Sequence, residues 1–291
     1  MSTLGLYSIA VLIWGSTWLA IKFQLGVVPP MVSVVWRFAL AGLLLLAYSV
    51  LRRRPLGFAA REHRWIALQG ALLFGLNYIG VYLSEQYLTS GLVAIVFSIV
   101  VFLNALGMRL FFGLKIRGST VLAAVVGVSG VALVFWPEML RFANQREQYA
   151  GLGWAIGSTV VCALGNMVAT RNHRHGLPVL QINAWSMLYG AGLVALLAFV
   201  TGQRFDFQAS WPYVISLVYL AVLGSAVAFG AYLTLMRRIG ADRAAYTAVA
   251  IPVVALLLST AFEQLQWRVA TFVGIGLCLA GNVLMLRRPL T

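Results

Sequence analysis

Two tryptophans and a threonine near the start of the chain are spaced so that a helix would bring them together. Trp14, Thr17 and Trp18 fall at i, i+3 and i+4, which places their side chains on one face of an α-helix. Such a face can stack two indole rings on a planar apolar ligand and offer it one hydroxyl group. These three residues are therefore candidates for a binding site.

Polar and aromatic residues in other apolar stretches extend this candidate site. Tyr78 and Tyr82 are four residues apart, with Asn77 beside them, and this spacing gives the two tyrosines one helix face. In the second half of the chain, Asn166 is the strongest polar candidate. Three weaker ones are Asn183, Ser225 and Tyr246. Core packing of the aromatic rings and hydrogen bonding between helices are the structural alternatives to ligand binding.

Arg37 is the one charged residue in the apolar stretch MVSVVWRFALAGLLLLAY, residues 31–48. A charge in hydrocarbon is costly, so Arg37 needs a partner. In a helix that starts at Met31, Arg37 lies about 9 Å from the end, a level that Lys22 shares, and Glu85 is the nearest plausible counter-ion. Two interpretations stay open: Arg37 bonds polar groups between helices, or Arg37 and Lys22 form an electropositive vestibule that contacts the substrate.

The sequence offers no arrangement of residues for catalysis. No nucleophile, base, acid pair or metal-ligand set falls at one depth of the apolar stretches, and Cys162 and Cys278 have no paired or metal-binding spacing. We therefore expect no enzyme activity, no metal and no cofactor. A phosphate-binding loop is also absent, which argues against ATP as the energy source. None of the seven carboxylates and three histidines lies mid-span, so we expect no obligatory proton step.

Composition and hydropathy predict an all-α polytopic membrane protein. Of 291 residues, 62% are hydrophobic and 10% are charged, and apolar stretches of membrane-crossing length recur along the whole chain. The ten predicted spans are Leu4–Ile21, Met31–Leu51, Trp65–Leu83, Gly91–Leu110, Gly118–Trp136, Gly151–Thr170, Pro178–Val200, Trp211–Leu235, Ala244–Phe262 and Val269–Leu286.

The net charge of +14 is distributed as a topology signal. The basic residues sit in pieces between apolar spans instead of gathering on one folded face, which argues against nucleic-acid binding. Most of the 21 Lys and Arg residues fall in the even-numbered connections and the C-terminal tail. The positive-inside rule then predicts that both termini are cytoplasmic.

The two halves of the sequence resemble each other at an offset of about 150 residues. RGSTVLAAVVGVSGVALV at 117–134 aligns with RVATFVGIGLCLAGNVLM at 268–285, and Pro30 aligns with Pro178. Each half, residues 1–140 and 141–291, would hold five spans. Since five is odd, the second half enters the membrane from the opposite face, and such inverted repeats are typical of transporters.

Small residues at four-residue spacing predict close contacts between helices. The pairs are Gly153 with Gly157 and Gly276 with Ala280, and Gly127 and Gly130 are further candidates. An oligomeric state does not follow from them.

The chain resembles the drug/metabolite transporter superfamily, and within it the EamA-type exporters of ten helices. The resemblance spans essentially the whole chain. It rests on four features: WGSTWLAIK near the start, VVWRFALAGLLLL in the second span, the AxxxxAIPV region at 245–254, and GxxLxxxG-like ends of each half. The chain is most similar to the YddG-type amino-acid exporters. This implies a bacterial inner-membrane protein that carries aromatic amino acids and related metabolites outward.

Proline usage departs from the pattern that the resemblance implies. Related repeats often place a proline in each of two central helices, where it kinks the helix and supports gating. Pro252 fills this role in the ninth span, but IVFSIVVFLNAL in the fourth span contains no proline. We therefore do not expect a symmetric pair of kinks.

Other functions remain open at this point. The same architecture fits a carrier of a drug-like cation, a nucleotide sugar or a lipid, although a cation carrier would be expected to hold a buried carboxylate. A membrane sensor that transports nothing is also compatible with the sequence, but its connections are too short to signal without a partner protein.

Overall fold

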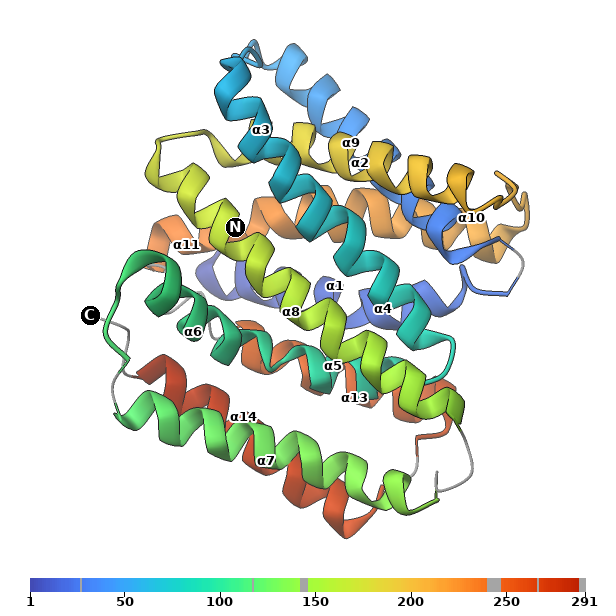
Figure 1. Cartoon of the computed structure of the whole chain (residues 1–291), viewed down its shortest axis with the longest axis vertical. Coiled ribbons are helices and arrows are strands. Elements are labelled where there is room, and N and C mark those ends of the chain that lie inside the picture. The colour runs from blue at the N-terminus through green and yellow to red at the C-terminus, as the bar shows by residue number, and fades with distance from the viewer. Residues whose placement is uncertain (27, 117, 142–145, 240–246, 266, 288–291) are drawn as a thin grey trace.

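The computed structural model describes residues 1–26, 28–116, 118–141, 146–239, 247–265 and 267–287, and Tyr246 lies outside these ranges. The described residues contain helices and no strands (Figure 1). In chain order the helices are α1 (Thr3–Lys22), α2 (Pro30–Leu51), α3 (Ala60–Gln69), η1 (Gly70–Leu76), α4 (Asn77–Glu85), α5 (Ser90–Phe97), α6 (Val100–Phe112), α7 (Gly118–Arg141), α8 (Arg146–Arg174), α9 (Val179–Val200), α10 (Trp211–Val218), η3 (Tyr219–Val227), α11 (Ala228–Ile239), α13 (Thr247–Glu263) and α14 (Val269–Arg287).

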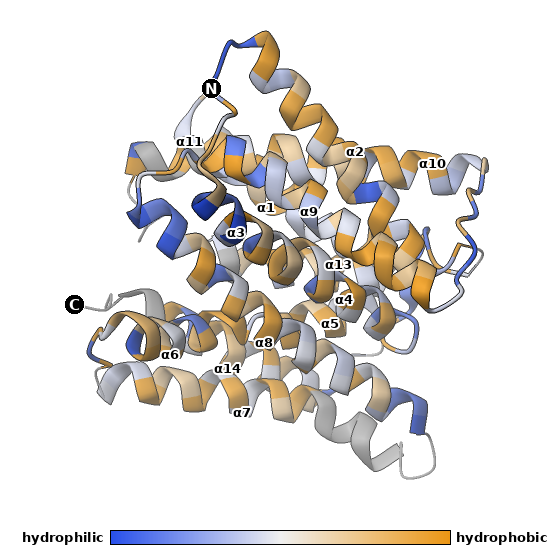
Figure 2. Ribbon diagram, turned by 45° about the horizontal axis from the view of Figure 1, so that its top comes forward, coloured by the Kyte–Doolittle hydropathy of each residue, from blue (hydrophilic) through white to orange (hydrophobic). Residues whose placement is uncertain are grey.

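Seven helical segments of the described chain are long and apolar enough to cross a membrane. They are Thr3–Lys22, Pro30–Leu51, Ala60–Glu85, Ser90–Phe112, Arg146–Arg174, Val179–Val200 and Trp211–Tyr232. Three shorter apolar helices are Gly118–Val134, Ala250–Glu263 and Val269–Leu284. Hydrophobic residues cover the length of these helices, and hydrophilic ones gather at their ends and connections (Figure 2). The chain is therefore a polytopic membrane protein.

Two helices extend beyond their apolar stretches. The third segment begins at Ala60, not at Trp65, and α8 begins at Arg146, not at Gly151. The added turns, AREHR and REQYA, are mostly polar. Arg, Glu and Gln are good helix formers, so a helix continues past the point where hydropathy falls. Hydropathy alone therefore places these two boundaries too late.

Two membrane-crossing segments contain π-helical stretches midway along their length. Gly70–Leu76 forms η1 between α3 and α4, and Tyr219–Val227 forms η3 between α10 and α11. In η3 the Ser225 hydroxyl donates to the carbonyl of Leu220, five residues earlier, at 3.1 Å. Segments of this kind are often found at functional sites.

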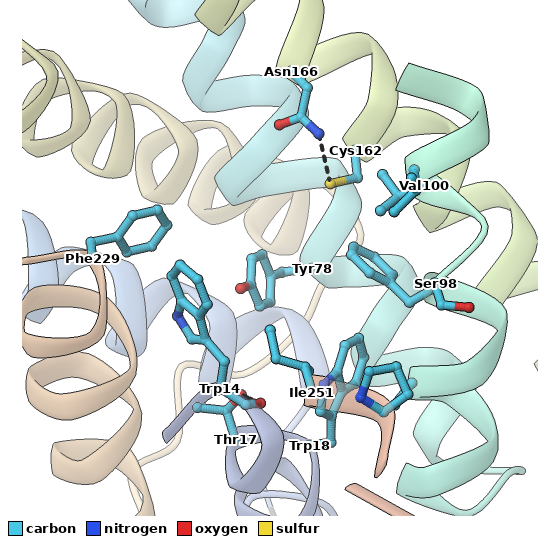
Figure 3. Close-up of a pocket in the computed structure, with 14 residues that line it drawn as sticks. Trp14, Thr17, Trp18, Tyr78, Ser98, Val100, Cys162, Asn166, Phe229 and Ile251 are labelled. Atoms are coloured by element: carbon cyan, nitrogen blue, oxygen red, sulfur yellow. Dashed lines mark hydrogen bonds between the residues drawn. The ribbon is translucent and has the colours of Figure 1, made fainter. Parts of the chain in front are cut away.

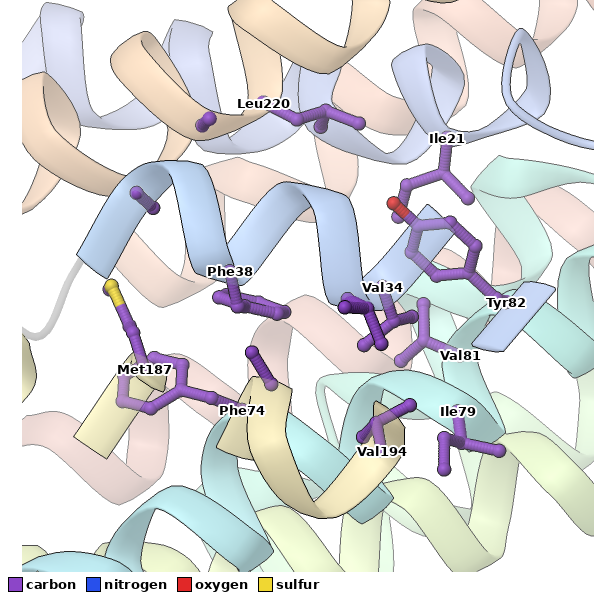
Figure 4. Close-up of a cluster of buried hydrophobic side chains, with 14 of the residues drawn as sticks. Ile21, Val34, Phe38, Phe74, Ile79, Val81, Tyr82, Met187, Val194 and Leu220 are labelled. Carbon is purple, nitrogen blue, oxygen red and sulfur yellow. The ribbon is translucent and has the colours of Figure 1, made fainter. Parts of the chain in front are cut away.

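The largest buried cluster lies between α2, α4, η1, α9 and η3 (Figure 4). Phe38 of α2 contacts the ring of Phe74 of η1 at 5.3 Å between centroids. A glycine is required where η1 meets α9, because a Cβ at Gly190 would lie 2.7 Å from the carbonyl oxygen of Gly70. These backbone contacts fix the position of α4, which carries Tyr78.

Helices α7 and α14 pack along each other at one edge of the molecule (Figure 1). We call their contact the glycine seam. A Cβ at Gly130 would lie 2.5 Å from the amide nitrogen of Cys278, and one at Gly281 would lie 2.6 Å from the amide nitrogen of Gly127. The prediction of close contact is thus confirmed for Gly127 and Gly130.

The other small-residue pairs make no such contact. A Cβ at Gly153, Gly157 or Gly276 would meet no described atom of another element within 4 Å. The prediction of close packing at these positions is wrong, because four-residue spacing defines a helix face without showing which neighbour that face meets.

Candidate functional site

A pocket of about 310 Å³ lies where α1, α4, α5, α6, α8, α11 and α13 meet (Figure 3). Aromatic side chains make up much of its wall: Trp14, Trp18, Tyr78, Phe97 and Phe229. Polar groups come from the Tyr78 hydroxyl and from Thr17, Ser98, Cys162 and Asn166. A mainly apolar wall with a few polar groups is the usual composition of a site for a small molecule.

Helix α1 supplies one wall, and its two indoles are held in different ways. Trp14 donates from Nε1 to the carbonyl of Gly224 at 3.0 Å and meets the ring of Phe229 edge-on at 5.1 Å. Trp18 meets Phe97 at 5.2 Å with an angle of 62° between the rings. The Thr17 hydroxyl donates to the carbonyl of Trp14 at 2.7 Å, so it has acceptor capacity left for a ligand.

Tyr78 of α4 forms another part of the wall, and Arg37 lies behind it. The Arg37 guanidinium carbon is 4.5 Å from the centroid of the Tyr78 ring and 5.1 Å from that of Phe38. Arg37 is 2% exposed, so it faces the bundle and does not reach outward to solvent. Because Arg37 stacks on Tyr78 and does not line the pocket, its position fits holding that ring in place.

Asn166 and Cys162 form the polar wall contributed by α8. The Asn166 side-chain nitrogen lies 3.1 Å from Oδ1 of Asn104 and 3.9 Å from Sγ of Cys162. Asn104 belongs to α6, so this pair also links α6 with α8. The amide oxygen of Asn166 is left as an acceptor beside the pocket.

The fourth segment is interrupted beside the pocket although it contains no proline. Helix α5 ends at Phe97 and α6 begins at Val100. The Ser98 hydroxyl donates to the carbonyl of Ile95 at 2.7 Å, beside the break, and the backbone N–H of Ser98 donates to the same carbonyl at 3.1 Å. Pro252 lines the same pocket, and α13 stays helical through it. The fourth segment is thus broken without a proline, whereas its counterpart α13 is continuous through one, so the two central helices are not interrupted in the same way.

Lys22, Glu85 and Glu263 lie together at the ends of α1, α4 and α13. The Lys22 ammonium donates to the carbonyls of Glu85 and Leu88, the latter at 2.7 Å, and lies 3.5 Å from Glu263. Glu263 accepts from the backbone N–H of Ser90 at 3.0 Å and from its hydroxyl. We call these residues the Lys22 network. It ties α1 to the end of α4 and the connection after it, and ties α13 to the first residue of α5.

Two expectations about charge require correction. Lys22 and Arg37 form no shared vestibule, because Lys22 is engaged by the network and Arg37 is buried against Tyr78. Glu85 is fully buried, and neither of its carboxylate oxygens has a hydrogen-bond partner among the described residues. Glu85 also forms no described ion pair with Arg37. Position in a span does not show burial, because burial depends on neighbours from other helices, here Lys22 of α1, which donates to the Glu85 carbonyl.

The remaining predicted site residues lie outside the pocket wall. Asn77 is buried and donates to the carbonyl of Leu73 at 3.1 Å. Tyr82 is fully buried and donates to Oε1 of Gln24 at 2.6 Å. Asn183 accepts from Gln69 at 2.9 Å across two helices. For Asn183 the structural alternative of hydrogen bonding between helices is confirmed.

Sequence reasoning missed several wall residues: Phe97, Ser98, Cys162, Phe229 and Ile251. Cys162 carried a usable signal, because it precedes Asn166 by one helical turn and so shares its face. Phe229 and Ile251 carried none, since phenylalanine and isoleucine also occur throughout the lipid-facing surface.

The pocket has the composition of a site that holds a small molecule. Its described lining contains no carboxylate and no histidine, and no group of three potential metal ligands occurs among the described residues. An aromatic pocket inside a bundle of membrane-crossing helices, beside an interrupted helix, defines a membrane transporter.

Comparison with known proteins agrees with this class. The model of the EamA-like transporter family matches residues 1–136 and 149–287, and the chain belongs to this family. Its relatives include the uncharacterized inner membrane transporter YedA of Escherichia coli (strain K12), which is 30% identical and covers 88% of this chain and 83% of its own. The uncharacterized transporter YoaV of Bacillus subtilis (strain 168) is 25% identical, over 87% and 85% of the two chains. A solved crystal structure shares the fold, with a TM-score of 0.68, 18% identity, and 97% and 96% of the two chains covered.

Proposed function

We propose that this transporter exports amino acids, with aromatic ones preferred, as the YddG-type exporters do. The observation that carries the proposal is the pocket wall of Trp14, Trp18, Tyr78, Phe97 and Phe229. Aromatic rings in offset or edge-on contact contribute about 0.5–1.5 kcal/mol beyond the area they bury. The polar groups of Thr17 and Asn166 would meet the polar end of such a substrate.

The proposed architecture has ten membrane-crossing helices in two inverted repeats, residues 1–140 and 141–291, with both termini cytoplasmic. Helix packing supports it: α1 packs on α11 and α13, α8 packs on α4, α5 and α6, α2 packs on α9, and α7 packs on α14. If each span of the first half is exchanged with its counterpart five spans later, the same set of packed pairs is obtained. The contacts of α1 with α11 and α13, for example, become those of α8 with α4 and with α5 and α6. The segments η1 and η3 also lie at equivalent places, about 150 residues apart.

Alternating access then takes place around the pocket. The break between α5 and α6 and Pro252 of α13 both adjoin the pocket, so each is a place where a central helix can bend. The Lys22 network lies at the helix ends that the topology places outside. In this proposal it holds the outer end closed while substrate enters from the cytoplasm.

The energy source in this proposal is the substrate gradient. ATP is left out because the sequence has no phosphate-binding loop. A proton step is left out because the described lining of the pocket has no carboxylate or histidine. If a proton step exists, Glu85 is the candidate carrier, because its carboxylate is buried next to the Lys22 network.

The test is release of radiolabelled amino acids from proteoliposomes that contain the purified full-length protein, with no ion gradient. We expect tryptophan, phenylalanine and tyrosine to leave faster than serine, and empty liposomes to retain all four. A parallel series with an imposed pH gradient should give the same rates. Uphill movement of substrate under that gradient would contradict the passive mechanism, and a Glu85→Gln variant would then show whether Glu85 carries the proton.

The same experiment separates the competing functions. If folded protein releases no amino acid, the aromatic assignment is wrong, and nucleotide sugars, lipids and drug-like compounds are the next cargoes to load. If none of these moves, the sensor interpretation replaces transport.

A further inference from the structure

A second hollow lies on a different face of α8 from the one that lines the pocket. It has a volume of about 410 Å³ and runs between α3, η1 and α6, with walls that include Trp65, Leu72, Phe112 and Val168. Helix α8 presents Cys162 and Asn166 to the pocket but Leu164, Val168 and Arg171 to this hollow. The two sites are therefore on different faces of one helix.

A smaller hollow of about 120 Å³ continues this groove deeper into the membrane. The two share Phe111, Leu164 and Met167, and the smaller one reaches Val160. From Val160 to Arg171 the axis of α8 rises about 16 Å. One leaflet of hydrocarbon is about 15 Å thick, so the combined groove has the length of a single acyl chain.

Two arginines flank the mouth of the groove, each over one of its aromatic walls. The Arg171 guanidinium carbon lies 4.7 Å from the centroid of Trp65, and that of Arg174 lies 4.3 Å from the centroid of Phe112. Arg171 is engaged by Glu62 at 2.5 Å. Arg174 is exposed and has no ion-pair partner among the described residues.

The helix ends around the mouth are strongly basic. Their exposed basic residues are Arg61, Arg64, Arg109, Lys115 and Arg174. The one acid in these stretches, Glu62, is already paired with Arg171. An apolar groove of leaflet depth with an unpaired cation at its mouth is complementary to an anionic phospholipid, since basic pockets between helices at a membrane surface bind acidic headgroups.

We propose that this groove binds one phospholipid with an anionic headgroup. One acyl chain lies along Leu164 and Val168, and the phosphate meets Arg174, with Arg171 held beside it by Glu62. The site is separate from the transport pocket, so the proposal does not depend on the identity of the transported substrate.

Native mass spectrometry of the purified full-length protein tests the proposal, with phosphatidylglycerol and phosphatidylethanolamine of matched acyl chains as probes. We expect wild-type protein to retain phosphatidylglycerol at least fivefold better. Arg174→Gln should bring this ratio down to about one. Arg52→Gln, which removes an exposed arginine on the connection after α2, is the matched control and should leave the ratio unchanged.

A second variant tests the apolar part of the groove. Leu164 is 40% exposed, so Leu164→Trp should fold and fill the groove. It should lower retention of both lipids at least threefold. Equal retention of the two lipids by wild-type protein, or equal effects of Arg174→Gln and Arg52→Gln, would overturn the proposal. Displacement of bound lipid by millimolar inorganic phosphate would also overturn it, because the site would then recognise phosphate without an acyl chain.

Discussion

Lys22 and Glu263 join the ends of α1 and α13 by an ion pair of 3.5 Å. The two residues come from opposite ends of the chain, and each also bonds near the start of α5, Lys22 to the carbonyl of Leu88 and Glu263 to the N–H of Ser90. Three separate segments are thus held together by one ammonium and one carboxylate. Releasing either group should loosen this end of the molecule without touching the pocket wall.

We predict that Lys22→Gln increases access to the pocket from this end. A partly buried ion pair contributes about 1 kcal/mol, which corresponds to about a fivefold shift between two conformations. Cys162 lines the pocket and can report it, in a Cys278→Ala background that removes the other free cysteine. The rate at which an impermeant maleimide labels Cys162 should rise about fivefold.

The matched control for this experiment is Arg204→Gln. Arg204 is an exposed basic residue that the topology places on the same side, outside the Lys22 network. If Lys22→Gln and Arg204→Gln change labelling equally, the Lys22 network does not close the pocket.

Trp18→Ala should weaken the transport of aromatic substrates selectively. Loss of one ring from the wall removes about 0.5–1.5 kcal/mol of contact, which is about 2- to 10-fold in apparent affinity. Concentration-dependent efflux of tryptophan and alanine measures this selectivity. Trp154 lies on the same bundle but is 46% exposed, so Trp154→Ala should alter neither substrate. An equal loss for tryptophan and alanine would show that Trp18 supports the fold and not recognition.

Arg37→Gln should separate stability from transport. Nε and Nη1 of Arg37 have no hydrogen-bond partner among the described residues, so removing the charge relieves a desolvation cost. We expect a thermal midpoint at least as high as that of the wild type. Export should fall about tenfold or more, because Tyr78 loses a buried cation–π contact of about 2 kcal/mol that fixes its ring. A folded, inserted Arg37→Gln protein with normal export would refute the role of Arg37 in positioning Tyr78.

Gly130→Ala should destabilise the protein strongly although it adds a single methyl group. The added Cβ would lie 2.5 Å from the carbonyl oxygen of Gly274, and overpacking of this kind costs about 1–3 kcal/mol. Thermal unfolding in detergent should show a lower midpoint. Gly153→Ala is the comparison, because its Cβ enters open space and should leave stability unchanged or slightly raised. Similar midpoints for the two variants would mean that α7 and α14 can move apart at the glycine seam without loss of stability.

The sequence predicted the membrane class and the α1 wall because both depend on local periodicity. Trp14, Thr17 and Trp18 share a face in any helix, and that face does line the pocket. Tyr78 and Tyr82 share a face by the same rule, yet Tyr82 bonds to Gln24 outside the pocket. Helical spacing fixes an angle around one axis, whereas tilt and the packing of neighbours decide which turn meets the cavity.

Long-range contacts account for the other differences. Three features depend on contacts between segments that are distant in sequence. They are the ion pair of Lys22 with Glu263, the burial of Glu85, and the position of Arg37 behind Tyr78. The break after Phe97 lacks its usual proline, so composition gave no sign of it. Each of these features arises when helices assemble, and a single helix carries no information about it.

The glycine seam between α7 and α14 has a mechanical consequence. With backbone against backbone at Gly127, Gly130 and Gly281, neither helix can slide along the other without a clash of main-chain atoms. The two helices, one from each half of the chain, should therefore move as one rigid unit. The distance between fluorophores placed on these two helices should stay constant throughout turnover. This constant distance is an internal reference for measuring the movement of the other helices.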